Sequence, residues 1–312
     1  MRKTLVMVMD DIAAIKVSKD TSFALLLEGQ RRGYQLRYLN EADLFLDKAT
    51  ALARMRALTV RDDPRHWFDL GPEEVRPLGE DDLVMMRSDP PVDSDYLYAT
   101  YLLDRAEAAG ALVVNRPQAL RDFNEKLAIA RFPELIPDTL VTSSAERIAN
   151  FVRERGKAVL KPLDGMGGRG IFLATADDRN LNVIIETLTA NGQQLAMAQQ
   201  FLPEIEAGDK RVLVVNGRPV PWVLARIPGA SDFRGNLARG GRGQGQALSD
   251  TDRAIAETVG PILVEHGIVF AGLDVIGDRL TEINVTSPTC VRELDAQFGA
   301  NIAGDLFDAI DS

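Results

Sequence analysis

Short apolar runs alternate with amphipathic stretches along the first third of the chain. The runs at residues 4–9, 34–39, 83–87 and 111–114 predict buried strands. Between them, a helix is predicted to start at Asp20 and end at Gly33, and a second one over 94–109 carries Tyr98, Tyr101 and Leu102 at helical spacing. Strands that alternate with helices predict a parallel sheet covered on both faces. Residues 51–60 interrupt this rhythm and predict the arm of a hairpin.

The pattern changes after about residue 121. A helix is predicted around Asn124-Glu125-Lys126, a linker at Pro133 and Pro137, and a helix capped by Ser143 or Ser144. Further strands and helices are predicted in two blocks. The strands are residues 158–161, 171–175, 194–201, 211–215, 220–226, 268–276 and 279–285, and the helices are residues 182–189 and 250–266.

Composition excludes several classes of protein. The chain has 312 residues and a formal charge of −10, which argues against a general nucleic-acid binder, although a local basic cluster could still bind a small anion. A single cysteine, Cys290, and two histidines exclude an intrachain disulfide and multi-cysteine metal sites, and argue against a histidine-based centre or a Ser-His-Asp triad. No run is long enough to span a membrane or to serve as a signal peptide, so we expect a cytoplasmic protein without a membrane partner.

A glycine-rich loop follows the apolar run that ends at Lys161. Residues 165–170 read GMGGRG and fit G-x-G-x-x-G, but a dinucleotide-binding loop should open a helix, whereas residues 171–175 favour a strand. No Gly-Lys-Ser/Thr follows, so a Walker loop also fails. A lysine that ends a strand beside mobile glycines can place a charge on phosphates while backbone amides approach them. A merely flexible hairpin remains the alternative.

Three oxygen-bearing side chains lie on a predicted hairpin turned at Gly277-Asp278. Glu282 and Asn284 are two residues apart and share a strand face, and their oxygens suit Mg²⁺. A two-residue loop would pair Asp274 with Thr281 and leave Glu282 on the other face. A site with Asp274, Glu282 and Asn284 therefore requires a three-residue loop or a bulge. The alternative is an ordinary polar face of a half-exposed hairpin.

Residues 226–243 form a basic, glycine-rich stretch in an acidic protein. The segment holds four arginines and five glycines but one acid, Asp232. Glycine supplies mobility and arginine supplies two-pronged recognition of carboxylate or phosphate. We expect a lid that closes over an anionic substrate, with a solvated loop as the alternative.

Together these segments resemble the ATP-grasp superfamily and, within it, the prokaryotic glutathione synthetases. The resemblance extends over nearly the whole chain, through KDTSFALLLEGQRRGY, MRSDPP, VNRPQALRDFNEKL, VLKPLDGMGG, DKRVLVVNG, RGNLARGGRG and GLDVIGDRLTEINVTSPTC. Met9-Asp10-Asp11 and residues 229–233 depart from the family's pattern. The resemblance implies an α/β fold, in which an N-terminal parallel-sheet, Rossmann-like domain precedes an ATP-grasp fold of two α+β subdomains. The expected boundaries are 1–122, 123–202 and 203–312.

The resemblance also implies a role for each residue of the site. ATP would be bound by the side chains and loop residues Lys126, Lys161, Gly165, Gly167, Gly168, Gln199, Leu202 and Asp209. Mg²⁺, or Mn²⁺ in its place, would be held by Asp274, Glu282 and Asn284. The transferring phosphoryl group and the oxyanion would meet Arg211, Arg226 and Arg234. The substrate would be bound by Arg87, Arg234, Asn236, Thr286, Ser287 and Arg292.

The implied reaction is the ligation of γ-glutamylcysteine to glycine with cleavage of ATP to ADP and phosphate. The route through an acyl phosphate needs no enzyme nucleophile, so Cys290 is interpreted as a packed small residue. Two alternatives stay open: another ATP-grasp carboxylate–amine ligase, such as a D-alanine–D-alanine ligase, and a non-catalytic ATP-binding module. The family resemblance also implies a homo-oligomer, a dimer or a tetramer.

Overall fold

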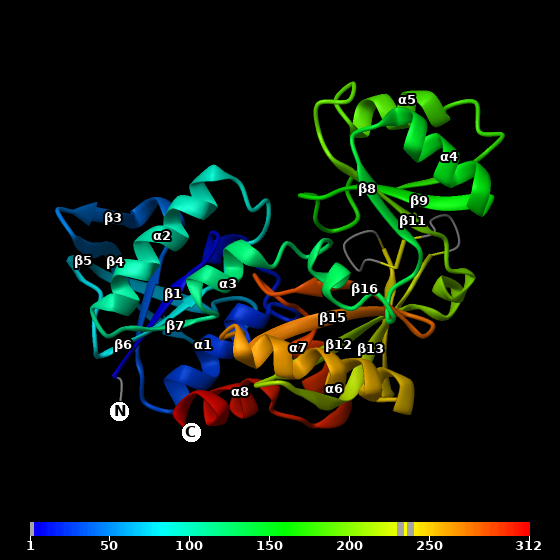
Figure 1. Cartoon of the computed structure of the whole chain (residues 1–312). Helices are drawn as coiled ribbons and strands as arrows, with labels where there is room; N and C mark the ends of the chain where they lie inside the picture. Colours follow the sequence, from blue (N-terminus) through cyan, green and yellow to red (C-terminus); the bar gives the residue numbers. More distant parts are fainter. Residues whose placement is uncertain (1–2, 230–233, 236–239) are drawn as a thin grey trace.

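A computed structural model describes residues 3–229, 234–235 and 240–312, and contains three sheets that follow one another along the chain (Figure 1). The strands of the first sheet lie in the order β3-β4-β2-β1-β6-β7, with β5 paired to β4, and they are β1 (Thr4–Val8), β2 (Gln35–Leu39), β3 (Leu44–Asp47), β4 (Thr50–Val60), β5 (Phe68–Pro77), β6 (Asp82–Met86) and β7 (Leu112–Val114). The second sheet has the order β10-β9-β11-β8, from β8 (Thr139–Thr142), β9 (Lys157–Pro162), β10 (Phe172–Thr175) and β11 (Ala196–Gln200). The third has the order β14-β13-β12-β15-β16, from β12 (Asp209–Val215), β13 (Arg218–Ile227), β14 (Arg242–Ala247), β15 (Phe270–Ile276) and β16 (Arg279–Asn284).

The first sheet confirms the predicted parallel arrangement. Strand β1 pairs in parallel with β2 and β6, and β6 pairs in parallel with β7. Every residue of β1 and β6 is buried, as expected for strands covered on both faces. The predicted hairpin arm is β4, which pairs antiparallel with both β3 and β5.

Helices cover the sheets. They are α1 (Thr21–Arg31), α2 (Ser94–Ala108), α3 (Pro117–Asp122), α4 (Ala145–Arg155), α5 (Leu181–Leu188), α6 (Asp250–Glu265), α7 (Val291–Phe298) and α8 (Ile302–Asp311). Short 3₁₀ turns are η1 (Ile12–Ala14), η2 (Glu41–Asp43), η3 (Ala128–Arg131) and η4 (Pro203–Ala207). Helices α7 and α8 follow the last strand, and α8 packs beside α1, so the end of the chain lies against its first helix (Figure 1). Among the described residues, no helix combines the length and the apolar character that crossing a bilayer requires.

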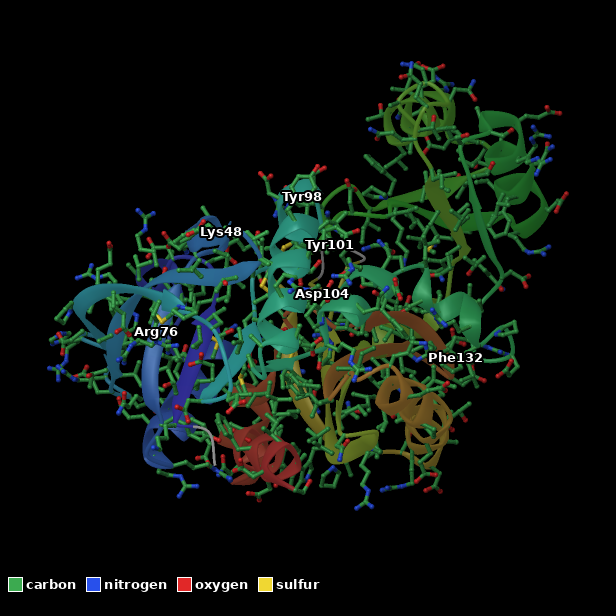
Figure 2. All side chains as sticks on the ribbon, turned by 60° about the vertical axis from the view of Figure 1, so that its left-hand side comes forward. Lys48, Arg76, Tyr98, Tyr101, Asp104 and Phe132 are labelled. Carbon is green, nitrogen blue, oxygen red and sulfur yellow. The ribbon has the colours of Figure 1, made fainter. Side chains whose placement is uncertain are left out.

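Two predicted helices need comment. The buried side of α2 is formed by Tyr96, Ala99 and Leu103, whereas Tyr98 and Tyr101 are exposed on its outer side (Figure 2). The predicted helix around Asn124-Glu125-Lys126 is wrong, because α3 ends at Asp122 and this tripeptide forms a turn before η3. The side chain of Asn124 accepts hydrogen bonds from the amides of Lys126 and Leu127, which stabilises the turn in place of a continued helix.

Residues 228–241 connect two paired strands, so the connecting segment is shorter than the predicted lid of residues 226–243. Arg226 pairs with Gly243 and Ile227 with Arg242 in the β13–β14 ladder. The predicted lid boundaries of 226–243 are therefore too wide, because both ends of that segment belong to regular strands. Asn236 and Arg239 lie outside the described residues, as does Asp232.

Candidate active site

Two cavities share part of one wall. The smaller lies between the second and third sheets, and the larger is lined by the third sheet, the glycine-rich loop and the segments that precede α1 and follow β6. Both cavities are open to solvent. Ile171, Asp274 and Glu282 line both cavities. The two acidic side chains therefore lie where ligands in the two cavities would meet.

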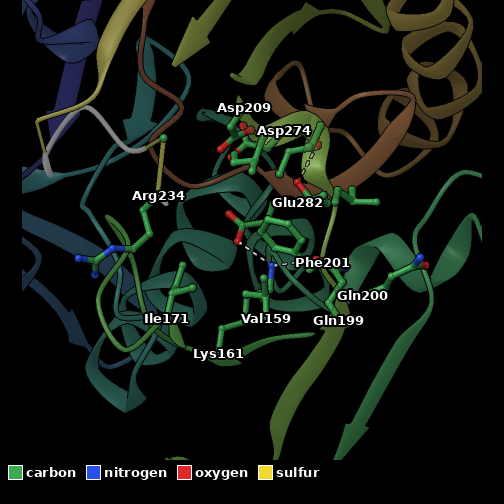
Figure 3. A pocket seen from close by; sticks show the side chains of 15 residues that line it. Val159, Lys161, Ile171, Gln199, Gln200, Phe201, Asp209, Arg234, Asp274 and Glu282 are labelled. Atoms are coloured by element: carbon green, nitrogen blue, oxygen red, sulfur yellow. Dashed lines mark hydrogen bonds and ion pairs between the residues drawn. The ribbon is translucent and has the colours of Figure 1, made fainter. Parts of the chain in front are cut away.

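The smaller cavity is lined by both apolar and charged side chains (Figure 3). Val159, Ile171 and Leu202 provide apolar surface, while Gln199 contributes a carboxamide that bonds Lys161 at 3.3 Å and Thr139 at 3.1 Å. This combination suits a flat, partly polar ring with an anionic group attached. Gln199, Leu202 and Asp209, which were predicted to contact ATP, all line it together with Lys161.

The glycine-rich loop connects β9 to antiparallel β10 and forms part of the wall of the larger cavity. Gly167, Gly168 and Gly170 have positive φ angles of 60°, 76° and 68°, a region that glycine adopts without strain. The predicted strand–loop–strand order is confirmed. Two cations reach the loop from distant segments: Nζ of Lys126 donates to the carbonyl of Gly165 at 2.7 Å, and Nη1 of Arg234 donates to that of Gly168 at 2.6 Å.

A β-bulge brings the predicted metal-binding carboxylates to one face. The hairpin loop has two residues, because Ile276 pairs with Arg279. Beyond Val275, which pairs with Leu280, the register shifts, so that Asp274 pairs with Glu282 and Thr281 is the extra residue. The bulge alternative is therefore the correct one. Gly272 pairs with Asn284 in the shifted register, which keeps all three side chains in one row.

Asp274 is held by two buried arginines. Nε and Nη2 of Arg211 lie 2.5 and 3.1 Å from its carboxylate oxygens, and Nη2 of Arg226 lies 2.8 Å from Oδ2. All three side chains are about 95% buried. Burial by itself would raise the pKa of Asp274, but the two guanidinium groups outweigh it and hold the pKa well below its ordinary value. Asp274 is therefore ionised at neutral pH.

Glu282 is the counterion of two lysines. Its Oε1 lies 3.3 Å from Nζ of Lys161 and 3.7 Å from Nζ of Lys126. Burial tends to raise its pKa, yet the two ammonium groups lower it below the ordinary value. Lys126 also pairs with Glu125, whose own pKa is raised by burial and by the charge of Glu282. With Glu125, which pairs with Lys126, and Asp209, which pairs with Arg226, the four cations face four carboxylates, so the cluster is largely neutralised.

Asp209 carries an unsatisfied oxygen in the smaller cavity. Its Oδ2 accepts from Nη2 of Arg226 at 2.5 Å, whereas its buried Oδ1 has no hydrogen-bond partner among the described residues. Burial raises its pKa to about 6, and the charge of Asp274 adds to this effect against the opposing charge of Arg226. An acceptor oxygen left without a donor is suited to a ligand hydroxyl.

The row of Asp274, Glu282 and Asn284 fits a hard divalent cation. It offers two carboxylates and an amide, and Nδ2 of Asn284 donates to the carbonyl of Gly272 at 3.2 Å, which leaves the amide oxygen available as a ligand. Within the described residues, no group of three His, Cys, Asp or Glu side chains has a metal-site geometry, so the amide is needed to complete the set. The carboxylates of Asp274 and Glu282 pair with arginine and lysine side chains of the protein. The phosphate oxygens of a bound ligand would attract these cations away from the carboxylates.

Some predicted substrate residues lie outside the large cavity. Thr286 and Ser287 line it, but Arg87 and Arg292 are absent from its wall. Arg87 is buried and donates to the carbonyl of Pro288 at 2.9 Å and to Oγ of Ser22 at 3.1 Å, so it supports the loop that carries Thr286 and Ser287. Arg292 instead contacts Asp62 at 2.8 Å.

Several residues of the large cavity were missed by sequence reasoning. Glu125 is one, although its position next to Lys126, a residue predicted to bind ATP, was a usable signal. Lys16, Lys19 and Glu293 also line the cavity. Lys16 and Lys19 lie near the N-terminus and Glu293 near the C-terminus, so no local motif joins them.

Family models match almost the whole chain. Residues 4–121 match the N-terminal domain of prokaryotic glutathione synthetase, and residues 125–299 match its ATP-grasp domain. A glutathione synthetase from Shewanella oneidensis is 57% identical over 305 residues, which cover 98% of this chain and 97% of that protein. One from Vibrio parahaemolyticus is 55% identical over 304 residues, with 97% and 96% covered.

Solved structures with the same fold are more distant in sequence. The D-cycloserine synthetase DcsG superposes with a TM-score of 0.68 at 13% identity, over 98% of each chain. The ATP-grasp ligase PsnB, solved with its minimal precursor, Mg and ADP, gives 0.60 at 19% identity, over 98% of this chain and 96% of that one. These likenesses confirm the ATP-grasp fold. With the family matches over nearly its full length, the chain belongs to the prokaryotic glutathione synthetases, a family of ATP-dependent ligases.

Proposed function

We propose that the smaller cavity binds the base and ribose of ATP, and that the phosphates extend past the common wall to the glycine-rich loop of the larger cavity. The larger cavity also binds γ-glutamylcysteine and glycine, and the reaction takes place at the common wall. The observation that carries this proposal is that Asp274 and Glu282 line both cavities. A phosphoryl group that moves from the nucleotide to the substrate must therefore pass these two side chains. The cations clustered there would stabilise its charge.

A carboxylate is a poor acyl donor, so the first step would activate it. An oxygen of the cysteinyl carboxylate attacks the γ-phosphorus of ATP, the bond to the β–γ bridging oxygen breaks, and ADP leaves. The product is an acyl phosphate with a good leaving group. The amine of glycine then attacks the acyl carbon, loses a proton, and the tetrahedral intermediate expels phosphate. We assign the stabilisation of the developing negative charge to Arg211 and Arg226, which line the larger cavity.

We assign the nucleotide contacts as follows. Gln199 and the backbone near Leu202 contact adenine, the orphan oxygen of Asp209 accepts from a ribose hydroxyl, and Lys126 and Lys161 hold phosphates under Gly165, Gly167 and Gly168. A divalent cation at Asp274, Glu282 and Asn284, Mg²⁺ or Mn²⁺ in its place, would neutralise phosphate charge and polarise the transferring group.

The remaining assignments concern the lid and the substrate. Arg234 lines the smaller cavity and bonds the glycine-rich loop, so we place it over the phosphates. Thr286 and Ser287 lie beside the reacting carboxyl, and Asn236 contacts the substrate. Arg87 acts as a positioning residue for the loop that carries Thr286 and Ser287. Arg292 would reach substrate only by leaving Asp62.

We keep the domain boundaries 1–122, 123–202 and 203–312 as part of the proposal, because each of the three sheets lies within one of these ranges. A cytoplasmic homo-oligomer stays a prediction, which sedimentation of the purified protein can test for its oligomeric part.

The deciding experiment is ADP release with ATP, a divalent cation and γ-glutamylcysteine, with and without glycine. Turnover that requires both substrates supports the proposal. Turnover with D-alanine alone would indicate another ATP-grasp ligase, and no turnover with any amine would indicate a binding module. Replacing Mg²⁺ by Mn²⁺ or by chelator identifies the cation.

A further inference from the structure

Four further side chains that line the large cavity carry charges of both signs. Lys16 and Lys19 precede α1, Asp20 caps that helix, and Glu293 lies in the first turn of α7. We call these four residues the head-group end. Helices α1 and α7 pack against each other, which brings together residues from the two ends of the sequence.

The charges of the head-group end are not neutralised by ion pairs. Within the described residues, none of these four side chains forms an ion pair with another or with any other group. This differs from the cluster at Asp274 and Glu282, where every cation has a carboxylate. The lysines are exposed at the rim, whereas Asp20 and Glu293 are half-buried.

Glu293 gives an independent sign that a ligand group belongs here. Its buried Oε2 has no hydrogen-bond partner among the described residues. Burial raises the pKa of Glu293, and Lys19 is close enough for its charge to oppose that effect. Burial also raises the pKa of Asp20. A buried acceptor without a donor is costly unless a ligand supplies one.

We infer that the head-group end recognises the α-amino acid head of the dipeptide's glutamyl residue. Asp20 and Glu293 accept from its α-ammonium group, and Lys16 and Lys19 bind its α-carboxylate. This inference rests on the proposed function and deepens it. The cysteinyl carboxyl must lie at the shared wall, so the glutamyl head of the dipeptide lies elsewhere along the same cavity, whose wall includes these four residues.

Glycine fits this end poorly, although it too is a zwitterion. Its amine must attack the acyl carbon, and one carbon separates that amine from its carboxylate. Its carboxylate therefore has to lie close to the shared wall. The four residues should accordingly affect the use of the dipeptide and leave the use of glycine unchanged.

The test combines variants with truncated substrates. Glutarylcysteine lacks the α-ammonium group, and 4-aminobutanoylcysteine lacks the α-carboxylate. Glu293→Gln should lower kcat/KM for γ-glutamylcysteine about 10-fold, the effect of one charged hydrogen bond, but should hardly change it for glutarylcysteine. The double change of Lys16 and Lys19 to Gln should also lower kcat/KM for γ-glutamylcysteine. It should hardly change kcat/KM for 4-aminobutanoylcysteine, which has no α-carboxylate for the lysines to bind.

Matched controls separate local from general effects. Lys48→Gln removes a lysine from the β3–β4 turn (Figure 2), which does not belong to the cavity wall, and should alter none of these values. If Glu293→Gln fails to fold, Asp20→Asn makes the same test, since asparagine caps a helix as well as aspartate does.

Two results would overturn the inference: an equal loss on full and truncated substrates, or a rise in KM for glycine in place of the dipeptide effect. A different result concerns the proposed function itself. If the unaltered protein releases no ADP with γ-glutamylcysteine and glycine, the proposed function fails before any variant is made.

Discussion

Two parts of the large cavity use charge in opposite ways. At the shared wall, Asp274 is buried and Glu282 partly buried, and each pairs with two cations. At the head-group end, Lys16 and Lys19 are exposed and Glu293 is partly buried, and none of them forms an ion pair within the described residues. The charges at the shared wall are paired within the protein and need no ligand. The charges at the head-group end are not paired within the described residues and are available to a ligand.

This difference separates structural from binding contributions. A charge removed from the shared wall leaves a buried partner uncompensated, so both stability and turnover should fall. A charge removed from the head-group end leaves no protein partner behind, so only substrate use should fall. The predictions below test this contrast, from the largest expected effect to the smallest.

Glu282→Gln should lower turnover about 10³-fold or more, because the residue lines both cavities and supplies a proposed metal ligand. Stability should fall far less, since Lys126 keeps Glu125 and Lys161 keeps Gln199. Steady-state ADP release and thermal unfolding measure the two effects. Glu257→Gln, on the exposed side of α6, is the control. Full turnover in a normally folded Glu282→Gln variant would remove this residue from the metal site.

Asp274→Asn should destabilise the protein by about 3 kcal/mol, because Arg211 loses its buried carboxylate. Asp278→Asn makes the same change at the turn of the same hairpin, where the ion pair with Arg279 is exposed, and should cost less than about 0.5 kcal/mol. Denaturant unfolding at neutral pH compares the two variants. Equal losses would mean that burial does not distinguish these pairs.

Asp209 should make stability depend on pH in an unusual direction. Its pKa in the folded protein is about 6, above the ordinary 3.8, so the folded state binds the proton more tightly than the unfolded state. The stability that this proton contributes is present below about pH 4 and is lost as the pH rises to about 6. Asp209→Asn should remove that decline. Denaturant unfolding of both proteins between pH 4 and 7 is the measurement, and parallel curves would contradict the assignment.

Arg234→Ala should raise KM for ATP about 10-fold and affect the dipeptide less, because Arg234 lines the smaller cavity and bonds Gly168. Arg242→Ala is the matched control, since that exposed side chain contacts only Gln244 among the described residues. Protease cleavage within residues 228–241 should slow when ATP and dipeptide are present. Cleavage at the same rate with and without both ligands would reject the lid.

Cys290→Ala should have the smallest effect, with turnover within about 3-fold of the parent. Cys290 lines the large cavity, but burial raises the pKa of its thiol and so disfavours the reactive thiolate. Loss of the sulfur should cost about 1 kcal/mol of stability through a small cavity. Complete loss of turnover, with fold and dipeptide binding intact, would give the thiol a chemical role.

Much of the fold was predictable because its signals are local. The buried runs of β1 and β6, the Asp20 cap of α1 and the Ser144 cap of α4 were all read correctly. The turn at Asn124-Glu125-Lys126 was missed because the asparagine competes with helix continuation through its own side chain. Strands β3, β5, β8 and β14 and helices α7 and α8 were not predicted at all.

The sequence by itself determined the types of group in the site and the segments that carry them. The glycine-rich loop after Lys161, the Glu282–Asn284 spacing and the surplus of arginine near Arg234 are all properties of contiguous residues. Such short-range patterns follow from strand alternation and backbone freedom, which depend on neighbours in the chain.

Only the tertiary structure decided which of those groups face one another. The bulge at Thr281 put Asp274 opposite Glu282, and strand pairing set Arg211 and Arg226 on Asp274. Packing of α1 on α7 brought Lys19 near Glu293. These contacts join residues far apart in sequence, and they form only because burying the apolar faces of the elements fixes where the elements lie.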